Sequence, residues 1–97
     1  MIYASIHSTG GYLPNKSLHN DDLPDHLDTS DEWIYARTGI HSRFIADEHE
    51  TTAFMAEQAA LDCMKNGNIS ANDIDMIIVA TCSTSHFFPS MACFVQK

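Results

Sequence analysis

The chain has 97 residues, of which 44% are hydrophobic and 19% are charged, and this composition excludes a disordered or fibrous protein. A chain of this length forms one short domain at most. The formal net charge is −8, with 13 Asp and Glu against 5 scattered Lys and Arg, which argues against a nucleic-acid partner because phosphate binding needs clustered basic residues.

The sequence shows no signal for export or membrane insertion. No apolar run is long enough to span a bilayer, and the N-terminus lacks the basic region and apolar core of a signal peptide. We therefore expect a cytoplasmic protein that makes no membrane contact. The cysteines Cys63, Cys82 and Cys93 are odd in number and lie in apolar segments, which favours reduced, packed thiols over a disulfide framework.

The first predicted element is a strand over residues 2–9, where apolar and polar side chains alternate. It ends in a tight turn at Gly10 and Gly11, and a loop follows. Asn20 is predicted to cap a short helix over Asp21–Leu27, in which a proline is tolerated only near the first turn.

The next segment has the marks of a helix at both ends. Thr29 and Glu32 form a capping box, in which the hydroxyl accepts from a free amide and the carboxylate reaches back to the cap. Gly39 stops this helix at its C-terminus.

A short strand and a long helix are predicted after it. Residues 43–46 are compatible with a short strand and residues 47–50 with a solvated acidic turn, and a helix over 51–66 then closes at Gly67. This helix packs through one apolar stripe, formed by Ala53, Ala56, Ala60, Cys63 and Met64.

The last part of the sequence predicts a buried strand between two helical pieces. Ser70 and Asp73 resemble a second capping box, for a single helical turn. The run over 76–81 is apolar on both faces, which predicts a parallel strand with helices above and below it. A final helix begins after Pro89 and covers residues 91–97.

This order of elements predicts an α/β fold. A strand buried on both sides needs parallel neighbours and two layers of helices, yet the sequence supplies too few strands and stops inside a helix. We therefore expect residues 1–97 to be an incomplete unit, the opening part of a larger fold.

One side of the second predicted helix carries residues that suit a nucleotide. Thr29, Trp33 and Arg37 are spaced by four residues and so lie along one face. The indole can stack on a purine and the guanidinium can bind a phosphate. The alternative is structural: Trp33 anchors the core, and Arg37 pairs with Asp31 or Glu32.

The segment Thr29–Ile40, with the sequence TSDEWIYARTGI, resembles the TSDEWI-x-x-RTGI signature of β-ketoacyl-acyl carrier protein synthase III. Other segments resemble the same family in order and spacing: Gly11–Pro14, Glu50–Thr51, Ile77–Thr81, and His86–Ser90 with Ala92–Cys93 behind it. The resemblance covers the whole chain as an N-terminal segment. It implies a thiolase-like fold, in which two related βαβαβ halves form layered sheets and helices in a dimer.

The resemblance implies the reaction of a condensing enzyme that initiates fatty acid synthesis. An acyl group passes from coenzyme A to a cysteine, and the carbanion of malonyl-acyl carrier protein, formed by decarboxylation, attacks it to give a 3-oxoacyl carrier protein. The implied partners are acyl-CoA and acyl carrier protein, in a homodimer. The coenzyme A thioester is a substrate, and no permanently bound cofactor is expected.

The same resemblance implies roles for four residues. Trp33 would stack on the adenine of coenzyme A, Thr29 would lie at the adenine edge, and Arg37 would bind near the phosphates. Phe88 would reach across the dimer interface and help to line the partner's acyl pocket.

We expect no catalytic residue within residues 1–97. The family's nucleophile lies in an Ala-Cys-small-Gly context beyond the matched region, and its assisting His and Asn lie further downstream. Cys93 resembles a helix cysteine of the family without a catalytic role, and inert packing is expected for Cys63 and Cys82.

No metal site is expected either, because the six histidines show none of the three- or four-residue spacings typical of zinc sites. The acidic residues that precede and open the second helix predict a solvated face, which would repel an acidic carrier protein. They are Asp21, Asp22, Asp25, Asp28, Asp31 and Glu32.

Two residues depart from the family pattern: Ser8 replaces the first Gly of its Gly-Thr-Gly turn, and His41 replaces a basic residue after the signature. Two other interpretations also remain open. The chain could be a non-catalytic acidic binding or assembly module with the same opening fold, or part of a related acyl-CoA condensing enzyme of another pathway.

Overall fold

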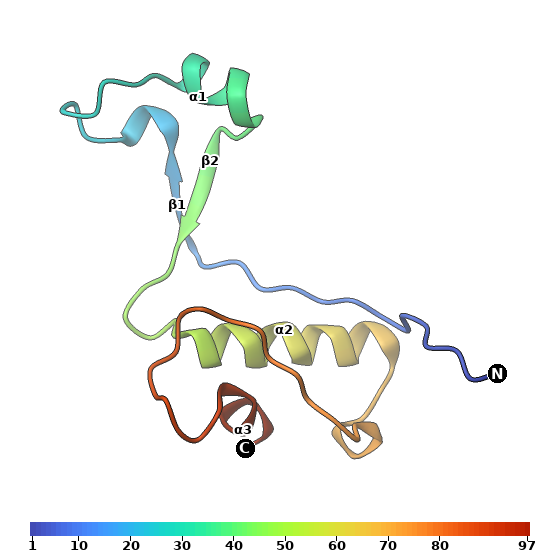
Figure 1. Cartoon of the computed structure of the whole chain (residues 1–97). Helices are drawn as coiled ribbons and strands as arrows, with labels where there is room; N and C mark the ends of the chain where they lie inside the picture. Colours follow the sequence, from blue (N-terminus) through green and yellow to red (C-terminus); the bar gives the residue numbers. More distant parts are fainter. The chain divides into compact units, whose positions relative to one another are not determined.

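The computed structural model describes residues 1–97, and the chain divides into two compact units. The larger unit consists of Met1–Tyr12 and Glu50–Lys97, and the smaller unit is Leu13–His49. Two strands, three α-helices and two 3-10 turns make up the regular structure, so the chain combines helices and strands as predicted (Figure 1).

The smaller unit is built on an antiparallel hairpin. Strands β1 (Lys16–His19) and β2 (Ser42–Ile45) pair so that His19 lies opposite Ser42. The predicted strand at 43–46 is confirmed. The sequence pattern missed β1, since its four residues KSLH include a single strongly apolar side chain and so show no clear alternation.

A 3-10 turn, η1 (Asn20–Asp22), stands where the helix over Asp21–Leu27 was predicted. Its N-cap is His19, and not Asn20, whose side chain is buried. The helix prediction is wrong because Pro24 has no amide hydrogen to donate and favours an extended residue before it, so the chain leaves the helical path there.

Helix α1 (Asp31–Thr38) confirms the predicted helix and its stop, because Gly39 adopts the left-handed conformation with φ of 68°. The cap is Ser30 rather than Thr29: its Oγ accepts a hydrogen bond from the amide of Trp33 at 3.1 Å. The predicted capping box is therefore wrong by one residue. Two adjacent hydroxyl residues can both cap a helix, and with Ser30 in that role Glu32 stands too early to reach back.

In the larger unit the longest helix is α2 (Thr52–Gly67). It begins one residue later than predicted, because Thr51 is its N-cap: the Thr51 Oγ1 accepts from the amide of Phe54 at 3.2 Å. It ends one residue later than predicted, because Asn68 and not Gly67 takes the left-handed conformation, with φ of 50°. Asparagine tolerates this conformation almost as well as glycine.

The N-terminal segment runs along α2 and does not form the strand predicted over 2–9 (Figure 1). The Ser8 hydroxyl donates to the carbonyl of Cys63 at 2.9 Å, and the Asn66 amide donates to the carbonyl of Thr9 at 3.0 Å. A strand needs a hydrogen-bonded neighbour, and no segment of this chain pairs with this one.

Gly10 is required for close approach to α2 and not for the predicted turn. A Cβ atom added there would lie 2.2 Å from the amide nitrogen of Cys63 and 2.6 Å from the carbonyl oxygen of Ala59. The same docking explains Ser8, which departs from the family pattern but uses its hydroxyl to bond to the helix.

The predicted acidic turn at 47–50 is solvated except at its last residue. Glu50 is buried, and the Tyr12 hydroxyl donates a hydrogen bond to its Oε2. The ring of Tyr12 also meets that of Phe54 edge to face, with centroids 5.6 Å apart. Burial of a carboxylate is accounted for by such a partner, which the sequence does not specify.

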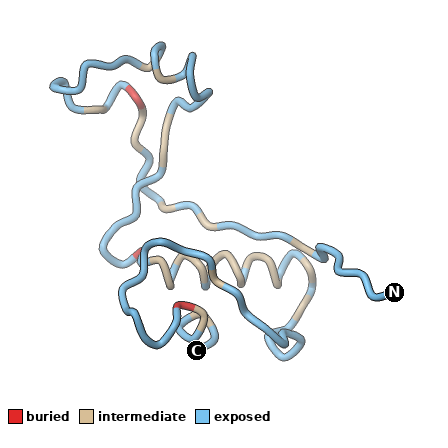
Figure 2. Tube along the Cα trace, viewed as in Figure 1, coloured by how far each residue is buried: buried red, intermediate tan, exposed pale blue.

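Turn η2 (Ala71–Asp73) confirms the second capping box, with reciprocal bonds between Ser70 and Asp73. Helix α3 (Met91–Gln96) confirms the last predicted helix, and it packs against α2. Met91 is the one buried apolar residue, so most of the chain is exposed or half-buried (Figure 2).

The apolar run over 76–81 is not a buried strand in this structure, and that prediction is wrong here. It forms no ladder, and Ile78 is 84% exposed. Between α2, α3 and the start of this run lies an apolar cavity of about 580 Å³, lined among others by Met64, Ile74 and Met76. The run lacks the neighbouring strands that would pair with it and bury it.

Candidate functional site

The candidate site is the surface of α1 that carries Trp33 and Arg37. The guanidinium carbon of Arg37 lies 3.9 Å from the centroid of the Trp33 ring, and Arg37 Nη1 donates to the Trp33 carbonyl at 3.2 Å. This is a cation–π contact between residues four apart on one helix.

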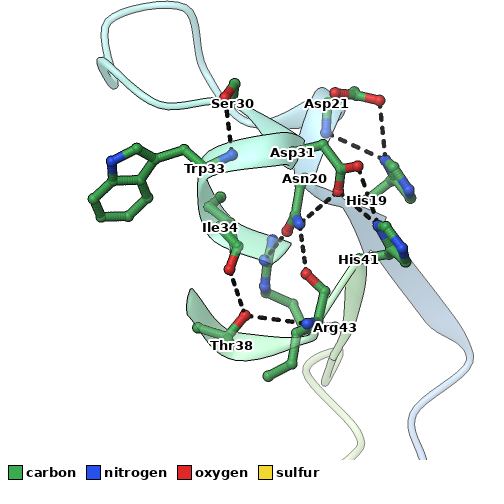
Figure 3. A network of polar contacts seen from close by, with 11 residues as sticks. His19, Asn20, Asp21, Ser30, Asp31, Trp33, Ile34, Thr38, His41 and Arg43 are labelled. Carbon is green, nitrogen blue, oxygen red and sulfur yellow. Dashed lines mark hydrogen bonds and ion pairs between the residues drawn. The ribbon is translucent and has the colours of Figure 1, made fainter. Parts of the chain in front are cut away.

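The indole of Trp33 is 53% exposed, and it points away from the polar network behind α1 (Figure 3). The structural alternative is therefore wrong in both parts: Trp33 does not anchor a core, and Arg37 lies on the indole and not on Asp31 or Glu32. An exposed aromatic face beside a cation can stack a purine and hold a phosphate.

Thr29, the third residue expected on this surface, lies apart from the pair. It precedes the N-cap and lines a small cavity of about 270 Å³ together with Asp21, Asp25 and other residues of η1 and the following loop. No hydrogen bond joins Thr29 to Trp33 or Arg37. The structure thus brings two of the three residues together.

Behind α1, the buried Asn20 holds the helix to the hairpin. Its Nδ2 donates to Asp31 Oδ1 at 2.8 Å and to the carbonyl of Ile40 at 2.7 Å, and its Oδ1 accepts from Arg43 (Figure 3). Arg43 also has a buried Nη1 without a partner. These bonds fix the N-terminus of α1 against the start of β2, and so orient the face that carries Trp33.

Asp31 and His41 are the hydrogen-bonded acid and imidazole of this network. His41 Nδ1 lies 2.9 Å from Asp31 Oδ1, and the His41 ring stacks on Tyr35 with centroids 4.0 Å apart. The hydrogen bond from His41, and after it the one from Asn20, lowers the pKa of Asp31 below its ordinary value. His41 thus serves as a partner of Asp31 in the position where the family pattern has a basic residue.

This network escaped the sequence analysis because its members lie far apart in the chain. Recognition of β1 would have revealed it, since the register that sets His19 opposite Ser42 places His41 beside His19. The rings of these two histidines lie 6.0 Å apart.

Phe88 belongs to the larger unit and is 88% exposed, next to a cis peptide bond between Phe88 and Pro89. The three cysteines are free, but Cys82 and Cys93 are exposed rather than packed, which corrects the prediction for these two. Cys63 is half-buried on α2, in contact with Ser8. No helix of the structure combines the length and the apolar character needed to cross a membrane.

Solved structures of ketosynthases share this fold. The 3-oxoacyl-[acyl-carrier-protein] synthase III from Aquifex aeolicus matches 93% of this chain, with a TM-score of 0.84 and 50% identity, over 29% of its own length. The priming β-ketosynthase of a polyketide biosynthetic pathway matches 94%, with a TM-score of 0.87 and 27% identity, over 27% of its length. The chain therefore has the α/β fold of part of a thiolase-like condensing enzyme.

Similar sequences point to a narrower group. Beta-ketoacyl-[acyl-carrier-protein] synthase III 1 of Vibrio parahaemolyticus is 56% identical over 95 residues, which cover 98% of this chain and 30% of that protein. No family model matches the chain. The chain spans about 30% of the length of the curated relatives that it matches. The resemblance found in the sequence is confirmed: over nearly its whole length the chain is similar to a segment of β-ketoacyl-acyl carrier protein synthase III proteins.

Proposed function

We propose that the chain is the part of a β-ketoacyl-acyl carrier protein synthase III that provides one wall of its coenzyme A site. The proposed enzyme is an acyltransferase that joins an acyl-CoA primer to malonyl-acyl carrier protein by decarboxylative Claisen condensation and so initiates fatty acid synthesis. The observation that carries the proposal is the half-exposed indole of Trp33 with the guanidinium of Arg37 3.9 Å above it, on the helix that holds the family signature.

The two side chains divide the recognition of coenzyme A between them. The adenine stacks on the indole, a contact worth on the order of 1–3 kcal/mol per base. Arg37 gives charge-assisted hydrogen bonds to the phosphates. Because Arg37 covers one face of the indole, the adenine takes the other face or displaces the guanidinium. Thr29, at the start of the same helix, is proposed to lie at the adenine edge.

The remaining parts of the proposal concern the assembled enzyme. We place the acyl transfer and decarboxylation chemistry on residues outside this chain, and the enzyme acts as a homodimer in the cytoplasm. Phe88 is proposed to reach the acyl pocket of the partner subunit. Its support is that a phenylalanine with 88% of its surface exposed is one that a neighbouring subunit would cover.

The acidic surface of the chain also bears on how the carrier protein docks. With 13 acidic and 5 basic residues, this segment repels an acidic carrier, so carrier docking is proposed to use basic residues elsewhere in the enzyme. Coverage of 98% of the chain by a synthase III relative favours the enzyme over a stand-alone acidic module.

The test is coenzyme A binding and condensation by the full-length protein with Trp33→Ala. Loss of the stacking contact raises the Kd for acetyl-CoA by about 5- to 150-fold in isothermal titration calorimetry. Tyr35→Phe is the control, because it alters another aromatic side chain of the same helix but keeps the ring that stacks on His41, and it leaves Kd near the wild-type value. A Kd unchanged by Trp33→Ala, or a wild-type protein without condensing activity, refutes the proposal.

A further inference from the structure

A second cluster of functional side chains lies at the N-terminal end of α1, apart from the exposed indole. His19, Asp31 and His41 each offer one ligand atom, and these atoms lie within 4.8 Å of one another. The residues come from three elements: His19 ends β1, Asp31 begins α1, and His41 directly precedes β2 (Figure 3).

The fold of the smaller unit brings these residues together. The hairpin register pairs His19 with Ser42, so the two histidines become neighbours across the strands, with ring centroids 6.0 Å apart. The loop after η1 brings the start of α1 next to the two histidines, so that Asp31 Oδ1 lies 2.9 Å from His41 Nδ1. Spacing along the sequence conceals this arrangement.

We propose that His19, Asp31 and His41 bind a divalent transition-metal ion, and that zinc is the ion bound. Two imidazole nitrogens and one carboxylate oxygen form a common protein ligand set for zinc, with water in the fourth position. With zinc–ligand bonds of ~2.0 Å, neighbouring ligand atoms in a tetrahedral site lie about 3.3 Å apart. The present separation of 2.9 Å between Asp31 and His41 is close to that spacing.

Binding requires two adjustments. The Nδ1 of His41 must release the hydrogen that it donates to the Asp31 carboxylate before it can ligate the ion, and the ring of His19 must turn. The two imidazole planes are nearly parallel, at 5°, so their nitrogens do not yet aim at a common point. His19 is the ring that must rotate, and its side chain is 43% exposed, so the core of the unit is not disturbed. The rotation gives up a hydrogen bond of 3.3 Å that the amide of Asp21 donates to His19 Nδ1.

The other two ligands are already held in place from behind. The buried Asn20 donates to Asp31 Oδ1 at 2.8 Å, and Tyr35 stacks on His41 with an angle of 8° between the rings. Outer contacts of this kind orient metal ligands and strengthen binding. The nearby guanidinium of Arg43 bonds to Asn20 and to none of the three ligands. A bound ion would therefore join β1, β2 and α1 at one point.

The test uses the full-length protein, stripped with a chelator and then titrated with zinc by calorimetry. We expect a site whose affinity falls more than about 10-fold in His19→Ala and in His41→Ala. His26→Ala is the matched control, since it removes an exposed histidine of the same unit that lies outside the cluster, and it leaves zinc affinity unchanged.

Two further measurements guard against a variant that merely fails to fold. Zinc raises the Tm of the wild-type protein and of His26→Ala, because binding to the native state alone stabilises it, and it does not raise the Tm of His19→Ala. In the unaltered protein, zinc shifts the ring nitrogen signals of His19 and His41 in an NMR spectrum. Unshifted signals, or equal zinc affinity in all three variants and the wild type, overturn the proposal.

Discussion

The docking of the N-terminal segment on α2 predicts a large effect of one methyl group at Gly10. In Gly10→Ala the new Cβ falls 2.2 Å from the Cys63 nitrogen and 2.7 Å from its Cα, about 1 Å short of ordinary contact. Both are backbone atoms of a helix and cannot turn aside, so the segment must move away. That movement stretches the bonds of Ser8 to Cys63 and of Asn66 to Thr9, which are 2.9 and 3.0 Å long.

The loss of stability in Gly10→Ala is the sum of the overpacking and of the weakened hydrogen bonds. Overpacking by one methyl group costs about 1–3 kcal/mol, and each of the two weakened hydrogen bonds adds about 0.5–1.5 kcal/mol, so we expect the free energy of unfolding to fall by about 2–6 kcal/mol. Urea denaturation of the full-length protein measures it. Gly11→Ala is the matched control, because an added Cβ there meets nothing within 4 Å and the residue has no positive φ, so its unfolding midpoint stays unchanged. Equal stability of the two variants would refute the docking geometry.

Two further predictions concern how α1 is held. Ser30→Ala removes the N-cap bond to Trp33 and lowers the free energy of unfolding by about 1 kcal/mol in urea denaturation, whereas Thr29→Ala changes it little. A larger loss in Thr29→Ala than in Ser30→Ala would show that Thr29 is the N-cap. Asn20→Ala removes the hydrogen bonds of its amide to Asp31, the Ile40 carbonyl and Arg43 and costs about 2–4 kcal/mol, while the exposed Asn15→Ala is neutral; a cost below 1 kcal/mol for Asn20→Ala would contradict the role of its amide.

The helices were predictable because their signals are local. Capping residues and left-handed stops act within a few residues of the helix ends, and α1, α2 and η2 were found from them, while α3 was found from the proline before its start. The errors at the ends have the same origin. Thr29 and Ser30 are both good caps, and Gly67 and Asn68 are both good stops, so local chemistry alone left each pair undecided.

The pairing of β1 with β2 was not predictable from periodicity, because it joins segments far apart in the chain and β1 shows no alternation. The network of His19, Asp31 and His41 depends on that pairing and was hidden with it. The place of Gly10 was likewise unreadable as sequence: a glycine that permits close approach looks the same as a glycine that permits a turn.

For the candidate site, the spacing predicted which residues are neighbours but not which way they face. Positions 33 and 37 meet on any helix, and in the structure they do. Whether the indole is buried depends on what packs against α1, which is a tertiary property. Thr29 shows the limit of the same reasoning. Helical spacing holds only within the helix, which begins at Asp31, and Thr29 precedes it.

The apolar run over 76–81 has the pattern of a strand buried on both faces, but no other segment of this chain pairs with it or covers it. Burial of an isoleucine side chain is worth about 1.5–3 kcal/mol, and Ile78, at 84% exposed, gains almost none of it. A single strand also makes no hydrogen bonds to a neighbouring strand, so it is not stable in water. The apolar pattern is therefore that of a strand with neighbours on both faces, which this chain does not supply, and the chain spans about 30% of the length of its relatives. The helices form without that environment because their hydrogen bonds and caps lie within the same segment. The strand does not form, because it needs neighbouring strands for its hydrogen bonds and its burial.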